Sequence, residues 1–492
     1  MWWKRDAFQF PESRHKGNRI TVKKTFKEEK NIMEKEKKPT TFGFAAFVMI
    51  ACFAFIMIPG ALLGAKIHVM FLLSWLIAFP LCMYLGYSYK ELQSGMIGFI
   101  PKCIVPVLLI LTIGALIGSW CASGTIAYIT WLGLRVISPK YFMATAFVVT
   151  LICACFTGTS FGTCGTIGVA LMGVALGMGL DPYWAASPIL CAAVVGDGMS
   201  PLSDTPNVIA GAAEVDMFES VRFQLPMTVP VAVISFLFYL VMGATGSVEA
   251  ADTSSISTLV QAIGDSYHLG IHCIIPIILV FGLLVMKFPA IPSILVGSLS
   301  ALVVACVAQG QTFGTVINAM WSGYTLHAEN EMVAKLFSRG GISGMTGTCV
   351  LIIFSFGLFG ILNEARILDT LVEPLSRLIK SRLSGVVCVI ILGFLANLSS
   401  SASFSEVFTG NIMTPVYDKA GLNRLDLARA ATVGCLVFSM FIPFVVMPAT
   451  VTASLGVDPV KMIPYYISMP LYLVVILVIT AFNLDRKLLE KK

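Results

Sequence analysis

The sequence contains several long stretches without a charged residue, and one of them, residues 141–180, runs for 40 residues. A helix crosses about 30 Å of hydrocarbon with roughly 20 apolar residues, so this stretch is long enough for two crossings. Inside lipid every backbone polar group must be satisfied internally. The sequence therefore predicts an all-α polytopic membrane protein with roughly 10 to 13 crossings. The other uncharged stretches are residues 42–65, 223–248, 288–326 and 384–404.

The composition and charge agree with a chain that has the lipid bilayer as its main partner. Charged residues make up 12% of the chain and the mean hydropathy is +0.86, whereas soluble chains carry about 25% charged residues. Residues 1–41 hold 12 Lys/Arg against 6 Asp/Glu and so account for the whole net charge of +6. The balanced remainder gives no reason to expect a nucleic-acid partner, and the oligomeric state is left open.

The basic ends predict the orientation in the cell membrane. Residues 1–41 form a basic tail before the first span, and residues 484–492 carry Arg486, Lys487, Lys491 and Lys492. Because cytoplasmic segments are enriched in Lys and Arg, we expect both termini to be cytoplasmic and the number of crossings to be even.

Cysteine and histidine give no sign of a cofactor. Most of the 13 cysteines lie inside apolar stretches without a CxxC spacing, and the five histidines are scattered. Small apolar packing explains such cysteines, and no metal-ligand spacing is present. We therefore expect no resident cofactor.

An internal repeat appears when the chain is shifted by 242 residues. Residues 179–216 then align without gaps with residues 421–458, and the matches include the Val-Asp pair that closes each segment. The same shift places residues 108–118 on 350–360. Two homologous halves are typical of secondary transporters, whose interrupted helices meet near mid-membrane. We expect a first half at 42–321 (repeat core about 108–221), a polar linker at 322–343 and a second half at 344–483 (repeat core about 350–463).

The stretch GDGMSPLSDTPN at residues 196–207 interrupts a very apolar region. A carboxylate at the centre of a span costs about 2.5–3.5 kcal/mol, so Asp197 and Asp204 are expected to face a polar interior. Pro201 and the two glycines predict an opened backbone between residues 196 and 207. Hard cations prefer oxygen ligands, which predicts a sodium site with these ligands: Asp197, Asp204, Ser200, Ser203, Thr205 and Asn207.

A second hydroxyl-rich break occurs at equivalent places in both halves. TGTSFGTCGT at residues 157–166 has its counterpart in NLSSSASFSE at residues 397–406, and the shift of 242 residues places residues 157–163 on 399–405. Interrupted helices of this type supply ligands to ions and anionic substrates, although Ser and Thr also pack helices closely. Glu406 is a candidate carboxylate from the second half. The hydroxyl and amide candidates are Thr157, Thr159, Ser160, Thr163, Asn397, Ser399, Ser400, Ser401 and Ser403.

The decapeptide GDGMSPLSDT at residues 196–205 resembles the signature of the NhaC-type sodium/proton antiporter family, part of the broader ion transporter group. The similarity extends in order and spacing over most of residues 42–483. It implies exchange of sodium for protons by two repeats, with Asp197 and Asp204 as leading ion ligands. The chain departs from the family pattern at Gly198, at Pro206 and in the second half, where Pro443 is followed by Phe and Val.

Three functions can be weighed against one another from the sequence alone. Secondary antiport of Na⁺ against H⁺ leads, because a desolvated carboxylate has a raised pKa and lets the two cations compete. The alternative is a Na⁺- or H⁺-coupled carrier of a small organic acid or amino acid, since relatives in the family exchange such solutes. An intramembrane aspartyl protease requires Gly-x-Gly-Asp, and Val194 stands where the first glycine would be. We therefore expect a transporter and not an enzyme.

Overall fold

The structure is a computed structural model that describes residues 37–485 except 64, 201–202, 246–252, 287, 373–378 and 399–401. Every regular element in this part is helical, which confirms the predicted all-α membrane class. The residues behind the predicted orientation, 1–36 and 486–492, lie outside it. Cytoplasmic termini therefore stay a prediction.

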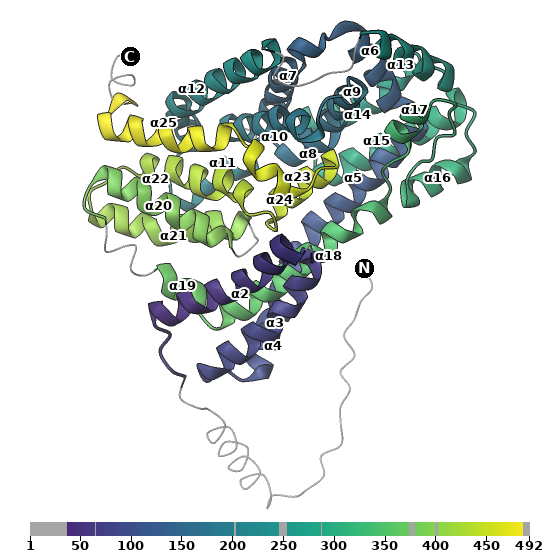
Figure 1. Ribbon diagram of the computed structural model, residues 1–492. Helices are drawn as coiled ribbons and strands as arrows, with labels where there is room; N and C mark the ends of the chain where they lie inside the picture. Colours follow the sequence, from purple (N-terminus) through teal and green to yellow (C-terminus); the bar gives the residue numbers. More distant parts are fainter. Residues whose placement is uncertain are drawn as a thin grey trace, which may run out of the picture.

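The helices follow one another through short connections (Figure 1). The first twelve are α2 (Phe42–Leu63), α3 (Ile67–Tyr84), α4 (Tyr89–Phe99), α5 (Ile104–Ala122), α6 (Thr125–Val136), α7 (Phe142–Thr157), α8 (Ser160–Thr163), α9 (Val169–Gly177), α10 (Pro182–Met199), α11 (Asp204–Ala212), α12 (Met217–Ala244) and α13 (Thr253–Ser266). The next are α14 (Ile275–Val285), α15 (Ala290–Ala308), α16 (Phe313–Ser322), α17 (Glu331–Phe337), α18 (Ile342–Glu364), α19 (Ile367–Val372), α20 (Arg382–Asn397), α21 (Ala402–Lys419), α22 (Arg424–Ala431), α23 (Val446–Leu455), α24 (Pro459–Met462) and α25 (Ser468–Phe482). Two π-helical segments, η3 (Cys164–Gly168) and η6 (Thr432–Val437), and the 3₁₀ segment η7 (Phe438–Phe441) join some of them.

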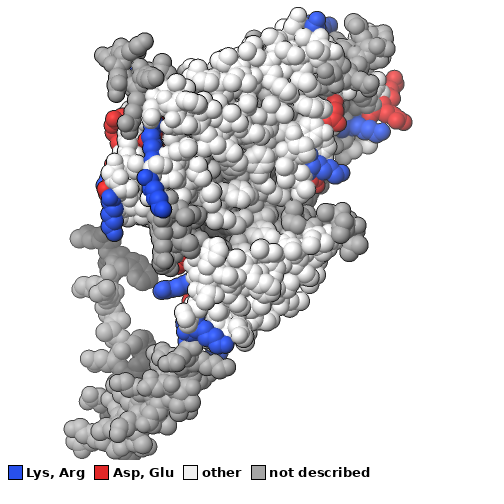
Figure 2. Space-filling view, turned by 60° about the vertical axis from the view of Figure 1, so that its left-hand side comes forward, with Lys and Arg blue, Asp and Glu red and all other residues white. Residues whose placement is uncertain are grey.

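Five described helical runs are long and apolar enough to span a membrane, or up to nine if each bent pair is one span. Residues 141–180 supply two of them, as expected, at Pro139–Thr157 and Ser160–Gly177. The range is lower than the 10 to 13 crossings expected from hydropathy because several apolar helices are short or bent by more than 40°. Figure 2 shows the corresponding surface: a broad uncharged face with charged residues gathered toward its edges.

The helix boundaries of the two halves correspond at the spacing of 242 residues. Moved by this amount, α5 falls on α18, α7 on α20, the run α8–η3–α9 on α21, and α11 on α23. α10 falls on α22–η6–η7, and α12 on α24 and α25. The architecture is therefore built from two similar series of helices.

The two halves use the same residues at equivalent helix ends, which explains why the repeat can be found in the sequence. Asp216 and Asp458, which close the matched segments, are the N-caps of α12 and α24: Asp216 Oδ1 accepts from Glu219 N at 2.9 Å, and Asp458 Oδ1 from Val460 N at 2.8 Å. Gly179 and Gly421 have φ of +72° and +64°, a conformation that favours glycine. The matched residues thus begin and end equivalent helices.

The helices that precede each repeat core pack on the first helix of the other repeat core. α3 and α4 pack on α18 of the second half, whereas α15 and α16 pack on α5 of the first half, and α5 packs on α18. We call α2–α5, α14–α16 and α18 the outer group, and α7–α12 with α20–α25 the inner group. In the outer group, the helices that lead into one repeat core therefore contact the first helix of the other core.

Close backbone contacts at two equivalent glycines allow α5 to pack on α16 and α18 to pack on α4. A Cβ at Gly118 in α5 would overlap the carbonyl oxygen of Ala319 in α16, and a Cβ at Gly360 in α18 would lie 2.8 Å from the carbonyl oxygen of Gly95 in α4. Small residues allow membrane helices to approach this closely. Gly118 and Gly360 are themselves 242 residues apart, so the same contact is used twice.

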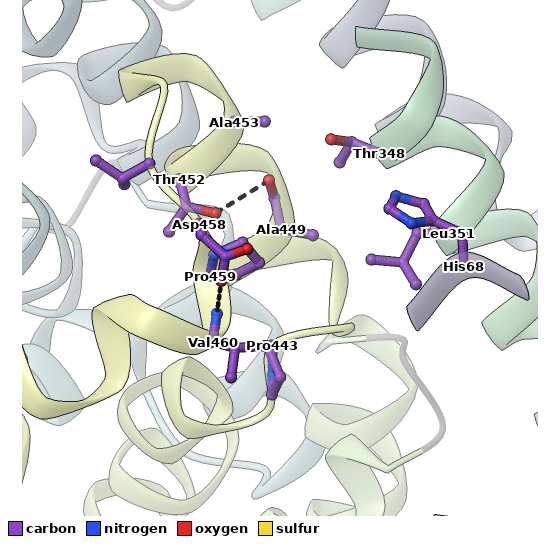
Figure 3. A pocket seen from close by; sticks show the side chains of 11 residues that line it. His68, Thr348, Leu351, Pro443, Ala449, Thr452, Ala453, Asp458, Pro459 and Val460 are labelled. Atoms are coloured by element: carbon purple, nitrogen blue, oxygen red, sulfur yellow. Dashed lines mark hydrogen bonds between the residues drawn. The ribbon is translucent and has the colours of Figure 1, made fainter. Parts of the chain in front are cut away.

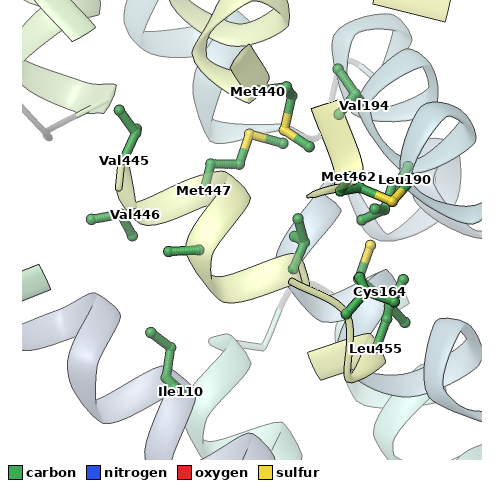
Figure 4. Close-up of a cluster of buried hydrophobic side chains, with 14 of the residues drawn as sticks. Ile110, Cys164, Leu190, Val194, Met440, Val445, Val446, Met447, Leu455 and Met462 are labelled. Carbon is green, nitrogen blue, oxygen red and sulfur yellow. The ribbon is translucent and has the colours of Figure 1, made fainter. Parts of the chain in front are cut away.

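The inner group encloses the largest part of the apolar core. Around α23, side chains from both halves interlock, including Leu190 and Val194 of α10 with Met440, Met447 and Met462 (Figure 4). Flexible methionine side chains fill irregular gaps of this kind. The packing places α23 at the centre of the molecule, in contact with the first half.

We predict that Gly118→Ala and Gly360→Ala each lower the stability of the purified protein by about 1–3 kcal/mol, because the added methyl group has no space at the backbone contact. The measurement is the midpoint of thermal denaturation in detergent, followed by tryptophan fluorescence. Gly344→Ala in α18 is the matched control, since a Cβ there meets nothing within 4 Å. A midpoint for Gly118→Ala equal to that of the control would contradict the proposed crossing.

Candidate functional site

The carboxylate of Asp197 joins the ends of three helices. Asp197 lies in the last turn of α10 and is 5% exposed. Its Oδ2 accepts hydrogen bonds from Ser160 N at 3.2 Å and Ser160 Oγ at 2.6 Å, and its Oδ1 accepts one from Ser203 Oγ at 2.5 Å. The two hydroxyl bonds have the short length of charge-assisted hydrogen bonds to a carboxylate.

The positions of the two serines give this site a positive electrostatic environment. Ser160 is the first residue of the helical run α8–η3–α9, and Ser203 is the N-cap of α11. Helix N-termini carry a partial positive charge that stabilises a nearby anion. The carboxylate therefore lies where two helix dipoles favour its charge, which offsets part of the cost of burying it.

The opened backbone at this site is shorter than the sequence predicts. α10 continues to Met199 and α11 begins at Asp204, so the predicted opening at 196–207 is reduced at both ends. Gly196 and Gly198 are helical because their N–H groups still have the carbonyl oxygens of the preceding turn of α10 as partners. The prediction that Asp197 itself sits on opened backbone is wrong, although the break falls directly after its turn.

The other predicted ligands of the first half have different surroundings. Ser200 is buried and its hydroxyl donates to Cys155 O at 2.7 Å. Asn207 is exposed, and its amide donates to Ser203 O at 2.7 Å. Thr205 is partly buried and its N–H donates to Ser203 Oγ at 3.3 Å. Asp204 begins α11, and its side chain lies outside the described part. The described geometry thus centres on Asp197, Ser160 and Ser203.

The three threonines near the first break bond locally. Thr157 Oγ1 lies 2.9 Å from Thr163 Oγ1 and donates to Cys153 O, and Thr163 Oγ1 lies 2.8 Å from Thr159 O. Thr159 is the N-cap of α8 and accepts from Gly162 N at 3.3 Å. Such bonds to the preceding turn are common for Ser and Thr in membrane helices. Ser160 is the residue of this cluster that the structure brings to the aspartate.

In the second half, Asn397 is the best-defined candidate. It ends α20, is fully buried, and donates from Nδ2 to Gly434 O at 3.0 Å and Cys435 O at 2.8 Å. Both carbonyls belong to η6, where the π-helical turn leaves them available. Its Oδ1 is buried and has no hydrogen-bond partner among the residues that the structure describes. Ser399, Ser400 and Ser401 lie outside the described residues, as does the side chain of Ser403 in α21. Glu406 in α21 is 3% exposed.

The two halves interdigitate at these breaks. α11, which follows the first break, packs on α21 of the second half, and Thr414 Oγ1 lies 3.2 Å from Ala212 O. Its counterpart α23 packs on α8, η3 and α9 of the first half. α10 also contacts η6. The helices around Asp197 and Asn397 therefore belong to one packed unit.

One charged cluster was not anticipated from the sequence. Arg382 Nε lies 2.7 Å from Asp426 Oδ2, and Arg429 Nη2 lies 2.8 Å from Asp426 Oδ1. Asp485 joins both arginines, at 2.5 Å to Arg382 Nη2 and 3.0 Å to Arg429 Nη1. The i, i+3 spacing of Asp426 and Arg429 is the one feature of the sequence that could have indicated an ion pair here. The cluster ties the starts of α20 and α22 to the end of α25.

A pocket of about 230 Å³ lies away from the aspartate, between the outer and inner groups (Figure 3). His68 of α3 and Thr348 of α18 face Pro443, Thr452 and Asp458 across it. None of the residues that the sequence predicts as ligands lines this pocket. The carboxylate of Asp197 held by Ser160 and Ser203, which we call the Asp197 clamp, is therefore the stronger candidate for the functional site.

Comparison with known proteins identifies the family. The sequence model of the Na⁺/H⁺ antiporter family matches residues 30–206 and 192–482. A malate-2H⁺/Na⁺-lactate antiporter of Bacillus subtilis is 31% identical over 88% of this chain and 92% of its own, and the Na⁺/H⁺ antiporter NhaC of Alkalihalophilus pseudofirmus is 30% identical over 87% and 93%. The arginine/ornithine antiporter ArcD of Halobacterium salinarum is 29% identical over 88% and 90%.

Among solved structures, the YdaH transporter of Alcanivorax borkumensis matches with a TM-score of 0.38 and 16% identity, over 80% of this chain and 88% of that one. The family match and the NhaC relatives confirm the resemblance seen in the decapeptide at residues 196–205. Since the match extends over both series of helices, the chain belongs to the Na⁺/H⁺ antiporter family, as a secondary transporter of the NhaC type.

Proposed function

We propose that the protein exchanges Na⁺ for H⁺ across the cell membrane and that Asp197 binds the two cations in turn. The observation that carries this proposal is the clamp of a 5% exposed carboxylate by Ser160 and Ser203 between two helix N-termini. A hydroxyl that donates to the carboxylate still has lone pairs for a cation. Together the three side chains offer a hard, all-oxygen ligand set of the kind that Na⁺ prefers.

The exchange follows from competition at one site. With Na⁺ bound, the carboxylate is ionised and the serine oxygens complete the shell. With a proton bound, the carboxyl group is neutral and the buried site carries no net charge. Either occupied state removes the cost of an isolated buried charge, and the empty, ionised state is the least favourable one for passage through the membrane. Because the empty, ionised site crosses the membrane least readily, the outward movement of one cation is coupled to the inward movement of the other.

The remaining predicted ligands have secondary roles in this proposal. Asp204 begins α11 one residue after Ser203 and is the second candidate carboxylate. Ser200, Thr205 and Asn207 hold the short connection between α10 and α11 in shape through their described hydrogen bonds.

A coupled exchange of organic solutes is the second candidate. Its specific support is the buried Oδ1 of Asn397, which has no hydrogen-bond partner among the described residues, together with relatives of similar identity named for malate, lactate, arginine and ornithine. A small carboxylate or amino acid would then bind at the second break while Asp197 keeps the coupling cation.

We predict that Asp197→Asn abolishes Na⁺-dependent pH change in proteoliposomes that contain a pH dye, because the amide keeps the size of the side chain but cannot take up a proton and lacks the negative charge that attracts Na⁺. Ser203→Ala is expected to raise the apparent KM for Na⁺ about tenfold and leave the maximal rate similar, since one hydroxyl among several ligands is lost. Asp204→Asn removes the charge of the second candidate carboxylate and is compared with Asp197→Asn. If Asp204→Asn abolishes exchange while Asp197→Asn transports normally, the carboxylate is wrongly assigned.

We predict that the apparent KM for Na⁺ rises about tenfold for each unit by which the pH falls below the pKa of the transport carboxyl group, because one proton and one Na⁺ compete for the site. Initial rates of Na⁺ uptake at several pH values and saturating gradients give this slope. A KM that does not depend on pH would rule out a shared site.

For the second candidate, we predict that exchange of labelled malate, lactate or arginine by the same proteoliposomes requires Na⁺ or a pH gradient and is lost in Asn397→Ala. Asn318→Ala in α16 serves as the control, since its side chain has no described role near the breaks. Full exchange of Na⁺ for H⁺ without any organic solute, together with no solute uptake, would leave the inorganic antiport alone.

A further inference from the structure

We propose that the cleft between α9 and α17 is a binding site for a phosphate or carboxylate group, with Arg339 as its central ligand. The cleft has a volume of about 500 Å³ and is lined by Leu176, Glu331, Lys335, Leu336 and Arg339. It lies in the segment that joins the two halves, apart from Asp197 and its clamp. The proposal does not depend on which ions the protein exchanges.

The guanidinium group of Arg339 has few partners for its charge. Its Nη2 donates a long hydrogen bond of 3.4 Å to Val169 O, and its buried Nε has no partner in the described part of the chain. Among the ion pairs of the described residues, none involves Arg339 or Lys335. Arg339 is partly exposed at the cleft, so an anion from outside the chain can reach its guanidinium group, whose planar fork of donors matches such a ligand.

A second unsatisfied group lies close to the guanidinium. Thr130 of α6 is fully buried, and its Oγ1 has no hydrogen-bond partner within the described ranges. Both groups approach Gly173 of α9: a Cβ at this residue would lie 2.6 Å from Thr130 Oγ1 and 3.7 Å from Arg339 Nη2. The absence of a side chain at Gly173 therefore lets the Thr130 hydroxyl and the Arg339 guanidinium group approach the same point of α9.

The lining determines which class of ligand fits. Lys335 and Arg339 contribute two positive charges against the single carboxylate of Glu331, which is exposed and lies four residues before Lys335 in the sequence. An arginine fork matches the oxygen geometry of phosphate and carboxylate groups. Leu176 and Leu336 add an apolar wall beside these charges. Both the phosphodiester of an anionic lipid and a soluble anion have the required group, and the apolar wall suits a lipid chain.

Binding of an anion would connect α17 with α9. The residues after Arg339, Gly340 and Gly341, turn the chain into α18, where Gly341 N donates to Gly114 O of α5 at 2.8 Å. α17 and α9 already touch at the cleft. The bound group would therefore fix the segment between the halves against the inner group and stabilise the folded protein by mass action.

The test uses the purified full chain in a neutral detergent and measures the midpoint of thermal denaturation by tryptophan fluorescence. One arm adds phosphatidylglycerol in steps with phosphatidylcholine as its control, and the other adds inorganic phosphate with chloride at equal ionic strength. We expect one arm to raise the midpoint in a saturable manner. A rise with phosphatidylglycerol alone assigns a lipid, and a rise with phosphate alone assigns a soluble anion.

Arg339→Gln is expected to weaken the effective ligand at least about tenfold, whereas Arg339→Lys keeps part of the effect because it keeps the charge but not the fork. Arg135→Gln is the matched control, since this exposed arginine stacks on Trp131 outside the cleft. If Arg339→Gln does not fold, Lys335→Gln carries the test and must weaken the same ligand. No rise in either arm, or an equal rise in wild type and the cleft variants, would overturn the proposal.

Discussion

The rule that hydrocarbon leaves no backbone polar group without a partner governs this structure. A helix that stops inside the membrane exposes free N–H groups, and each interruption here is closed by another element. Asp197 accepts from the N-terminus of α8 and from the cap of α11, and Asn397 binds the free carbonyls of η6. The side chains that make these two interruptions tolerable are also the ones that we propose as ligands for a cation or solute.

The two halves share their helices but not their chemistry. Shifting the first half by 242 residues places Asp197 on Ser439 and Ser203 on Val445, while Asn397 has Cys155 as its counterpart. Neither the serine pair around Asp197 nor the amide of Asn397 is therefore repeated at the equivalent positions of the other half. The two repeats share an architecture, but the proposed ligand positions in them differ.

Much of this arrangement can be predicted from the sequence, because local chemistry sets helix ends. Capping residues and glycines recur in both halves, so the repeat and the breaks were visible. The pairing of Ser160 with Asp197 was not, since the two residues are 37 positions apart and neighbouring threonines in the same cluster bond to their own turns. The ion cluster of Arg382 and Asp485, 103 positions apart, was missed for the same reason: sequence patterns do not show which distant side chains meet.

The interdigitation of the halves has a consequence for biosynthesis. α11 ends at residue 212, and the helix on which it packs, α21, begins at residue 402. At about 5–20 residues per second, the ribosome takes roughly 10–40 seconds to make the intervening chain. During this time the short helix after the first break can pack on α10 and α12 but lacks its partner from the second half. The hydrogen bonds of Asp197 join residues of the first half alone, so they can form before the contact between α11 and α21, which is among the last to be made.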